Sequence, residues 1–377
     1  MNRTVYISET NCITPLGFDV ANNIKNIENG ISGIEKKLNR SLMEKPFYAA
    51  SIDENDLEIA FTKIESDSNF TKLEKMMILA LHPMFKNHKV NSRTALIVST
   101  TKGNITALEK NSELEFQKST LYELAKTIAD YFGFTCEPIV VSNACVSGIL
   151  SVAVAKRIIQ SKMYDQVFIV AGDTISEFVI SGFNSFQAMS NLPCRPYSKN
   201  RDGVTLGEAA AAVLVTSNKE NAKVIILGDG SINDANHISG PSRTGEGLVR
   251  SIESAFKEAN IDSNKIDYIS AHGTATPFND EMEAIAFNRL GLEYVPTNSL
   301  KGYYGHTLGA SGLLETVIGI ASVEQKKIFK SLGFDEMGVS QDIAIIKINE
   351  NKAIRYFLKT ASGFGGCNTA IVFKKVN

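Results

Sequence analysis

The feature that most constrains the fold is a repeated alternation of short apolar runs with helix-like segments. Apolar runs of strand length occur in both halves of the sequence, at residues 4–8, 94–100, 138–144, 166–173, 222–230, 267–273, 342–349 and 368–375. They are apolar nearly throughout, as expected for strands that are covered on both faces. Helical periodicity fills the gaps, for example at residues 148–160 and 312–325. This alternation predicts an α/β protein with mostly parallel sheets.

A polar stretch near residue 217, with the sequence TSNKENAK, separates two series of strands and helices. We interpret it as the junction of two similar halves, residues 1–217 and 218–377, which share one compact body. A chain of 377 residues is long enough for that arrangement. Residues 30–90 are more polar and irregular, which predicts that they elaborate the surface.

The composition argues against several classes of protein. Apolar residues make up 44% of the chain and charged residues 21%, which is ordinary for a globular protein. The formal net charge is −2, so no basic excess favours nucleic acid or an anionic membrane surface. The sequence shows no signal-peptide pattern, and no apolar run reaches about 18 residues. We therefore expect a cytoplasmic protein without membrane insertion.

The cysteines are odd in number and widely spaced, at Cys12, Cys136, Cys145, Cys194 and Cys367. A disulfide scaffold or a zinc knuckle would show paired spacings such as CxxC. We expect reduced thiols, which leaves a cysteine available for chemistry.

The segment VVSNACVSG places Cys145 between a buried strand and a helix. The positive end of the helix dipole and unpaired backbone N–H groups favour a thiolate there, so we expect a lowered pKa. The small neighbours Ala144, Ser147 and Gly148 would give a substrate thioester room to approach. A buried cysteine that only fills the core is the alternative for this segment taken alone.

Two of the five histidines lie in Gly/Thr-rich turns that follow predicted strands. His272 lies in SAHGTATPFND, and His306 lies with Lys301 in SLKGYYGHTLGASG. Each could also be a histidine satisfied by hydrogen bonds within its turn. Zinc binding is disfavoured, because neither turn has HxH or HExxH spacing and no CxxC lies nearby.

A fourth segment, SGFGGCN from Ser362, carries the consecutive glycines Gly365 and Gly366. Such a pair permits backbone geometry that can aim N–H groups into a site. None of the glycine-rich turns fits GxGxxG after a strand or GxxxxGK[ST], so dinucleotide and P-loop sites are not predicted.

Together these motifs resemble the β-ketoacyl-[acyl-carrier-protein] synthases of the thiolase superfamily. The matching segments run in order along nearly the whole chain: ITPLG at 13–17, NACVSG at 143–148, CRPYSKNRDGVTLGEAAA at 194–211, DANHISGP at 234–241, AHGTATPFND at 271–280, KGYYGHTLGASGLLE at 301–315 and GFGGCN at 363–368. The resemblance implies a thiolase-like five-layered α-β-α-β-α sandwich of two related halves. It also implies a homodimer, or a heterodimer with a related synthase subunit.

The activity implied by the resemblance is a decarboxylative Claisen condensation. Cys145 would accept an acyl group from a phosphopantetheine thioester, and a malonyl extender would lose carbon dioxide and attack that acyl group. His272 and His306 match the two histidines that polarise the extender's carbonyl as neutral hydrogen-bond donors. No cofactor or metal is implied, since both substrates are carried on the phosphopantetheine of an acyl carrier protein, which is the expected partner.

The same resemblance assigns further positions. Lys301 matches the lysine that supports the active-site network, and Glu315 matches the carboxylate paired within it. Phe364 matches a mobile gate over the acyl pocket, and its backbone N–H, with that of Cys145, would bind the oxyanion. The positions that match substrate-binding residues are Thr274, Thr276, Ser239, Gly365 and Gly366.

The sequence departs from the family pattern at several places. Tyr303 and Tyr304 stand where less bulky residues are usual, and the chain is shorter than typical elongation synthases. These departures predict a specialised synthase of a pigment or polyene pathway instead of the housekeeping enzyme of fatty-acid synthesis. Two alternatives remain: a thiolase that uses coenzyme A, and a non-catalytic partner that sets chain length. The presence of Cys145, His272 and His306 favours an active condensing enzyme over the second.

Overall fold

The computed structural model describes residues 3–66, 69–110, 112–236, 238 and 240–376. Ten strands form one continuous sheet in the order β11-β10-β14-β15-β9-β1-β8-β6-β4-β5. The first half contributes β1 (Tyr6–Ile13), β4 (Thr94–Ser99), β5 (Ile139–Val141), β6 (Gln166–Asp173) and β8 (Ala209–Thr216). The second half contributes β9 (Val224–Asn233), β10 (Tyr268–Ser270), β11 (Thr297–Asn298), β14 (Tyr356–Gly363) and β15 (Cys367–Lys375).

The two halves of this sheet have the same topology. From the outer edge inward, each half places its third strand, then its second, fourth, fifth and first. The two first strands, β1 and β9, meet as an antiparallel pair at Tyr6–Ile225 and Ile7–Val224. The repeated order confirms the prediction of two related halves.

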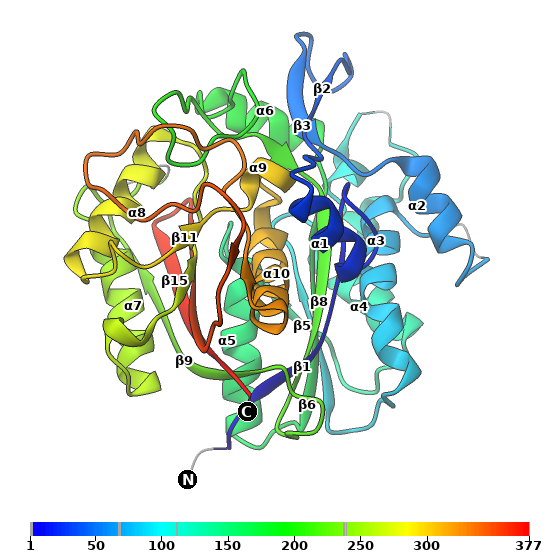
Figure 1. The fold of residues 1–377 in the computed structure, drawn as a ribbon. Helices are drawn as coiled ribbons and strands as arrows, with labels where there is room; N and C mark the ends of the chain where they lie inside the picture. Colours follow the sequence, from blue (N-terminus) through cyan, green and yellow to red (C-terminus); the bar gives the residue numbers. More distant parts are fainter. Residues whose placement is uncertain (1–2, 67–68, 111, 237, 239, 377) are drawn as a thin grey trace.

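The two halves of the sheet form two separate layers, and helices lie between them and on both outer faces, which gives five layers in all (Figure 1). The central helices α5 (Ser147–Gln160) and α10 (Ser311–Gln325) contact each other between the two halves of the sheet. One outer layer contains α3 (Lys72–Leu81) and α4 (Leu121–Tyr131), and the other contains α7 (Glu246–Ala259) and α8 (Pro277–Arg289). Every residue of α10 from Ser311 to Val323 is buried, as a helix enclosed on all sides requires. The predicted five-layered α-β-α-β-α sandwich is confirmed.

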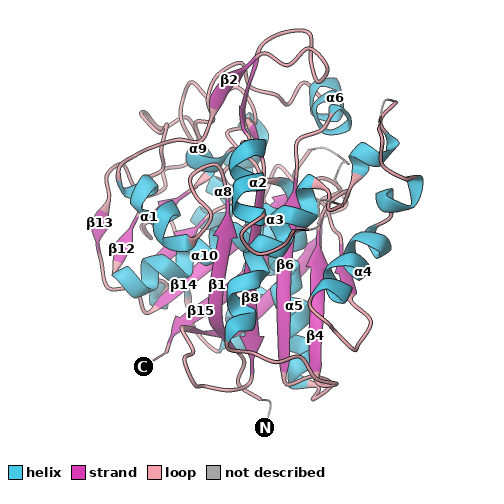
Figure 2. Cartoon of the chain, turned by 90° about the vertical axis from the view of Figure 1, so that its right-hand side faces the viewer, coloured by secondary structure: helices cyan, strands magenta, loops and turns pink. Residues whose placement is uncertain are grey.

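The remaining α-helices and strands lie around this five-layered core, and Figure 2 shows several of them. They are α1 (Val20–Glu28), β2 (Glu35–Lys37), β3 (Phe47–Ala50), α2 (Glu54–Phe61), α6 (Glu177–Ser185), β7 (Leu206–Gly207), α9 (Lys301–Tyr304), β12 (Lys327–Ile328) and β13 (Glu350–Asn351). The β2–β3 hairpin, α6 and α9 gather at the end of the molecule opposite the two termini (Figure 1).

Three sequence-based expectations need correction. The sheet is mixed, because β6–β8, β1–β8, β1–β9, β9–β15 and β14–β15 are antiparallel pairs. Residues 342–349 form no strand, and only Ile345 makes an isolated bridge, to Thr297. The polar region 30–90 is not merely surface elaboration, because α3 buries Leu73, Met76 and Met77 against the sheet.

A buried ion cluster ties the central layer to the second half of the sheet. Lys156 of α5 is 1% exposed, and its Nζ lies 2.9 Å from Asp229 of β9 and 2.5 Å from Glu258 of α7. Asp229 is 2% exposed and also pairs with Arg157. Removing one partner of such a pair leaves a charge buried without full compensation.

We expect Asp229→Asn to lower the free energy of unfolding by about 3 kcal/mol, because Lys156 then keeps only Glu258 as its partner. Denaturant titration followed by circular dichroism measures this change. Asp130→Asn is the matched control, since it removes the carboxylate of the exposed pair with Lys126 and should leave the transition midpoint unchanged. Equal midpoints for the two variants would contradict the prediction.

Candidate active site

Residues from four separate motifs meet at one cavity of about 460 Å³. Cys145 follows β5, His272 follows β10, His306 lies between α9 and α10, and Phe364 follows β14. Sites in α/β proteins commonly form at the carboxyl ends of strands, where these turns lie. Among the other lining residues are Phe183, Phe186, Ile238, Thr274, Thr276, Phe278 and Met282. The cavity therefore combines reactive side chains with a largely apolar wall.

Cys145 lies in a tight turn between β5 and α5. Ala144 has a φ of 43°, in the left-handed region, which turns the chain sharply before the cysteine. The Ser147 hydroxyl donates to the Ala144 carbonyl (2.6 Å) and accepts the N–H of Asn143 (2.7 Å). The Cys145 Sγ lies 3.1 Å from the Nε2 of His306. The structure thus brings the predicted nucleophile and one predicted histidine into contact.

This contact depends on the close approach of α5 and α10. A Cβ at Gly148 would lie 2.6 Å from the carbonyl oxygen of Gly309, and a Cβ at Gly312 would lie 2.8 Å from the Cβ of Ile149. Such distances leave no room for side chains at either glycine. The expectation that Gly148 gives the substrate room is therefore corrected, because Gly148 packs against the start of the second central helix.

His306 is fixed at both its backbone and its ring. Its backbone N–H donates to the Thr205 carbonyl (2.6 Å), and its Nδ1 lies 3.0 Å from the Oγ of Ser311. A hydroxyl can donate or accept, so Ser311 satisfies either neutral tautomer of this ring. His306 can therefore present its Nε2 to the cavity as a base or as an N–H donor.

His272 is oriented from behind by Lys301. The Lys301 Nζ donates to the carbonyl oxygen of His272 (2.6 Å) and lies 3.3 Å from its Nδ1. It also lies 2.6 Å from the Oε1 of Glu315. Because an ammonium group can only donate, this arrangement leaves the ring hydrogen of His272 on Nε2. Lys301 and Glu315 are buried behind the histidine and are not among the residues lining the cavity.

Burial sets the protonation states of the site. It lowers the pKa of both His272 and His306 well below the usual value, and the Lys301 charge acts in the same direction. These directions favour neutral imidazoles, as the sequence analysis expects. Burial raises the pKa of Cys145 to about 11, against the opposing charges of Lys102 and Lys301. The prediction of a lowered thiol pKa is wrong for the free protein, because the desolvation penalty exceeds the favourable charges. The thiol therefore carries a proton that must leave before attack.

Two carboxylates that sequence reasoning missed hold the turn of His272. Glu283 accepts the backbone N–H groups of His272 (2.8 Å) and Gly273 (2.7 Å). Asp280 accepts the N–H of Thr274 (3.0 Å), and burial raises the pKa of its carboxyl to about 7. Their spacing of three residues at the start of α8 places both on one helix face. That spacing was the available signal in the sequence.

Phe364 contacts the nucleophile turn and an aromatic cluster. An interaction with its backbone N–H lowers the pKa of the Cys145 thiol, but this effect is smaller than that of burial. Its ring stacks on Phe183 with centroids 5.5 Å apart and meets the edge of Phe186 at 5.4 Å. Phe183 lies on α6 and Phe186 directly follows this helix, so α6 lies next to Phe364, the residue predicted to gate the acyl pocket.

The predicted substrate-binding residues are only partly brought together. Thr274 and Thr276 line the cavity with their hydroxyl oxygens 2.9 Å apart, and Gly366 lines it as well. Gly365 is exposed, and its N–H donates to the carbonyl of Ile238 (2.6 Å), so that N–H is already occupied. Ser239 lies outside the residues that the structure describes.

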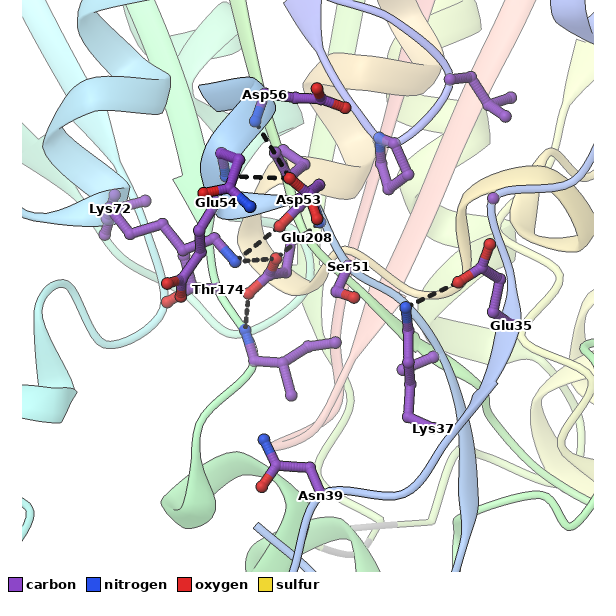
Figure 3. Close-up of a pocket in the computed structure, with 18 of the residues that line it drawn as sticks. Glu35, Lys37, Asn39, Ser51, Asp53, Glu54, Asp56, Lys72, Thr174 and Glu208 are labelled. Atoms are coloured by element: carbon purple, nitrogen blue, oxygen red, sulfur yellow. Dashed lines mark hydrogen bonds and ion pairs between the residues drawn. The ribbon is translucent and has the colours of Figure 1, made fainter. Parts of the chain in front are cut away.

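A second cavity, of about 1050 Å³, is larger but lies among other residues (Figure 3). Lys72 and Glu208 form an ion pair of 2.7 Å at its wall. Glu208 is buried and also accepts the backbone N–H groups of Ile52 (2.9 Å) and Ile175 (3.1 Å). No predicted site residue that the structure describes lines this cavity. Its central carboxylate is engaged in structural contacts, and the reactive groups lie in the smaller cavity.

Two further properties concern the described residues only. Among them no group of three or more His, Cys, Asp and Glu side chains could hold a metal ion. No helix in the same part of the chain is long and apolar enough to cross a bilayer.

Comparison with known proteins shows the family to which the chain belongs. Residues 2–221 match the family described as beta-ketoacyl synthase, N-terminal domain, and residues 224–335 match beta-ketoacyl synthase, C-terminal domain. The 3-oxoacyl-[acyl-carrier-protein] synthase 2 of Staphylococcus aureus (strain COL) is 26% identical over 415 residues, which covers 99% of each chain.

Solved structures share the fold. One chain of the complex of a ketosynthase with its chain length factor from Xenorhabdus doucetiae superimposes with a TM-score of 0.88 and 23% identity over 99% of this chain and 98% of that chain. One chain of the complex AntDE:AntF, in which the acyl-carrier protein of a type II polyketide synthase binds its ketosynthase, gives a TM-score of 0.86 and 21% identity over the whole of both chains. At these sequence identities, the structural similarity is evidence for the fold alone.

We expect alkylation of Cys145 by iodoacetamide to accelerate about tenfold per pH unit between about pH 7 and 9, because only the thiolate reacts. A thiol with a pKa of about 11 is mostly protonated throughout that range. Peptide mass spectrometry measures the rate, and Cys145→Ala identifies the adduct. A rate that levels off below pH 8 would contradict the raised pKa.

Proposed function

The chain belongs to the β-ketoacyl synthase family, and on that premise we propose how its cavity catalyses a decarboxylative Claisen condensation. The proposed reaction joins an acyl group to a malonyl extender carried on an acyl carrier protein. The observation that carries the proposal is the convergence of Cys145, His272 and His306 in one cavity, with sulfur and imidazole 3.1 Å apart.

In the first half-reaction Cys145 attacks the carbonyl carbon of an acyl thioester. Its thiol proton passes to the Nε2 of His306 and then to the departing carrier thiol, so no net charge is left in the pocket. The backbone N–H groups of Cys145 and Phe364 would stabilise the oxyanion that forms. The N–H of Phe364 acts on the Cys145 thiol to lower its pKa, which supports this assignment.

In the second half-reaction the malonyl thioester loses its carboxylate as carbon dioxide. The electron pair left behind forms an enolate, which attacks the acyl carbon and expels the Cys145 thiolate. The thiolate then takes up one proton from solvent, which restores the thiol. His272 and His306 would donate N–H hydrogen bonds to the enolate oxygen, which requires neutral rings with a hydrogen on Nε2. The contact from Lys301 to Nδ1 of His272 supports that tautomer. Lys301 and Glu315 act as positioning residues here.

Substrate and partner assignments follow from the same premise. The hydroxyls of Thr274 and Thr276, which line the cavity, would bind the phosphopantetheine arm. We propose an acyl carrier protein as the donor of both substrates and a dimer with an identical or related subunit, in line with the complexes formed by similar ketosynthases. The absence of a cofactor, the cytoplasmic location, the junction near residue 217 and the pigment or polyene pathway stay predictions from the sequence.

The test is intact-protein mass spectrometry after mixing the protein with two carrier proteins, one loaded with a medium-length acyl chain and one with malonate. We expect an acyl adduct on the wild type, followed by a carrier-bound product longer by two carbons. Cys145→Ala should show neither, and Cys12→Ala, which removes another buried thiol, should behave as the wild type.

The possible failures have different meanings. An adduct with coenzyme A donors only would support the thiolase alternative. A folded protein that takes no acyl group from any donor would refute the catalytic proposal and favour the non-catalytic chain-length partner.

We expect His272→Ala to acylate Cys145 at a rate close to that of the wild type but to extend the acyl group roughly 10²–10⁴-fold more slowly, as is typical when a positioned donor is lost. The reason is that His272 faces the extender, whereas His306 contacts the thiol. Single-turnover quench experiments separate the two steps. Equal slowing of acylation and extension would show that His272 is needed for both steps.

A further inference from the structure

A second buried lysine, Lys359 on β14, lies behind the same catalytic centre. Its side chain is 0% exposed, and its Nζ lies 2.6 Å from the Oε2 of Glu315. The other oxygen of that carboxylate pairs with Lys301. One carboxylate on α10 therefore bridges two buried ammonium groups from different elements, α9 and β14.

The remaining contacts of Lys359 are with backbone carbonyls. Its Nζ donates to Thr360 (2.6 Å) and Ser270 (3.1 Å), and lies 3.4 Å from the carbonyl oxygen of Ala271. Ser270 is the last residue of β10, and Ala271 connects it to His272. An ammonium ion held by carbonyl and carboxylate oxygens is satisfied without water, so the contact fixes the strand end that carries the histidine.

We propose that Lys359 is a positioning residue of the condensing reaction, an inference that rests on the proposed function. Lys359 holds the end of β10 and Glu315 in place and keeps the histidine pair neutral. It acts through His272 and touches neither substrate nor sulfur. The resemblance from which the site residues were predicted assigned no role to this position.

The surrounding charges agree with such a role. Lys301, Glu315 and Lys359 together carry one excess positive charge in the core. Burial lowers the pKa of Lys359 itself, and Glu315 opposes that shift. Other charged groups that act on the cluster or the histidines include Glu283 on α8 and Lys102 after β4. Burial is the main reason that the pKa of each histidine is low, and Lys359 adds to it.

The sign of the pH effect follows from this. A neighbouring cation disfavours the imidazolium form, so removing Lys359 should raise the pKa of His272 and His306. Because the neutral rings are the active form, extension would then fail at a higher pH than in the wild type.

The experiment compares Lys359→Met and Lys359→Gln with Lys156→Met, which removes another fully buried, ion-paired lysine from α5. We expect the acid limb of the pH–rate profile for extension to move upward by about one pH unit in both Lys359 variants. Acylation of Cys145 at neutral pH should change less than about threefold. The Gln variant keeps N–H donors for the same carbonyls, so it tests the charge if the Met variant does not fold.

The Lys156→Met control should lose stability but keep the wild-type pH profile. Identical profiles in the Lys359 variants and the control would overturn the inference. Failure of both Lys359 variants to fold, with Lys156→Met folded, would also overturn it in favour of a purely structural role. Absence of extension in the wild type would instead refute the proposed function, so the two failures are distinguishable.

Discussion

The packing of α5 against α10 is the constraint on which the rest of the site depends. The two helices begin within a few residues of Cys145 and His306, so the distance between their first turns sets the distance between thiol and imidazole. Glycine at 148 and 312 lets the backbones approach closely where any side chain would force them apart. The catalytic contact is therefore a consequence of helix packing between the halves, and neither half could make it alone.

The duplicated topology explains why the motifs meet although they are far apart in the sequence. In each half the third strand, β5 or β11, is followed by a short connection and then a central helix; in the second half this connection contains α9. Cys145 occupies that connection in the first half, and His306 occupies it in the second. The second strands also correspond, and the one in the second half, β10, leads to His272. The two halves have the same architecture, but only the first supplies the nucleophile and only the second supplies the two histidines.

The sequence predicted the parts of this arrangement that have a local signature. Cys145, His272 and His306 lie in short turns after apolar strands, so their role could be inferred from neighbours in the chain. The network behind them could not, because Lys359 meets Glu315 and Ser270 only after β14, α10 and β10 have packed. The sequence analysis also did not predict β8 and β14, for a local reason. β8 opens with alanines, which favour helix, and β14 contains a lysine that interrupts its apolar pattern. Residues 342–349 have the composition of a strand but pair at only one position.

The electrostatics of the core distinguish between two ways of using a cysteine and a histidine. A thiolate–imidazolium pair needs groups that stabilise a positive ring, such as a carboxylate that accepts its N–H. Here the described contacts of Glu283 are with backbone N–H groups, a tyrosine and other polar side chains. Glu315 forms ion pairs with two lysines. In these described contacts neither carboxylate accepts an N–H from a histidine ring. The imidazoles are left in a buried environment with excess positive charge, which disfavours their protonation. Such an environment favours a neutral thiol and two neutral rings in the free protein. In the proposed mechanism the ring N–H groups would then stabilise an enolate, and neither ring would first have to give up an ion-pair partner.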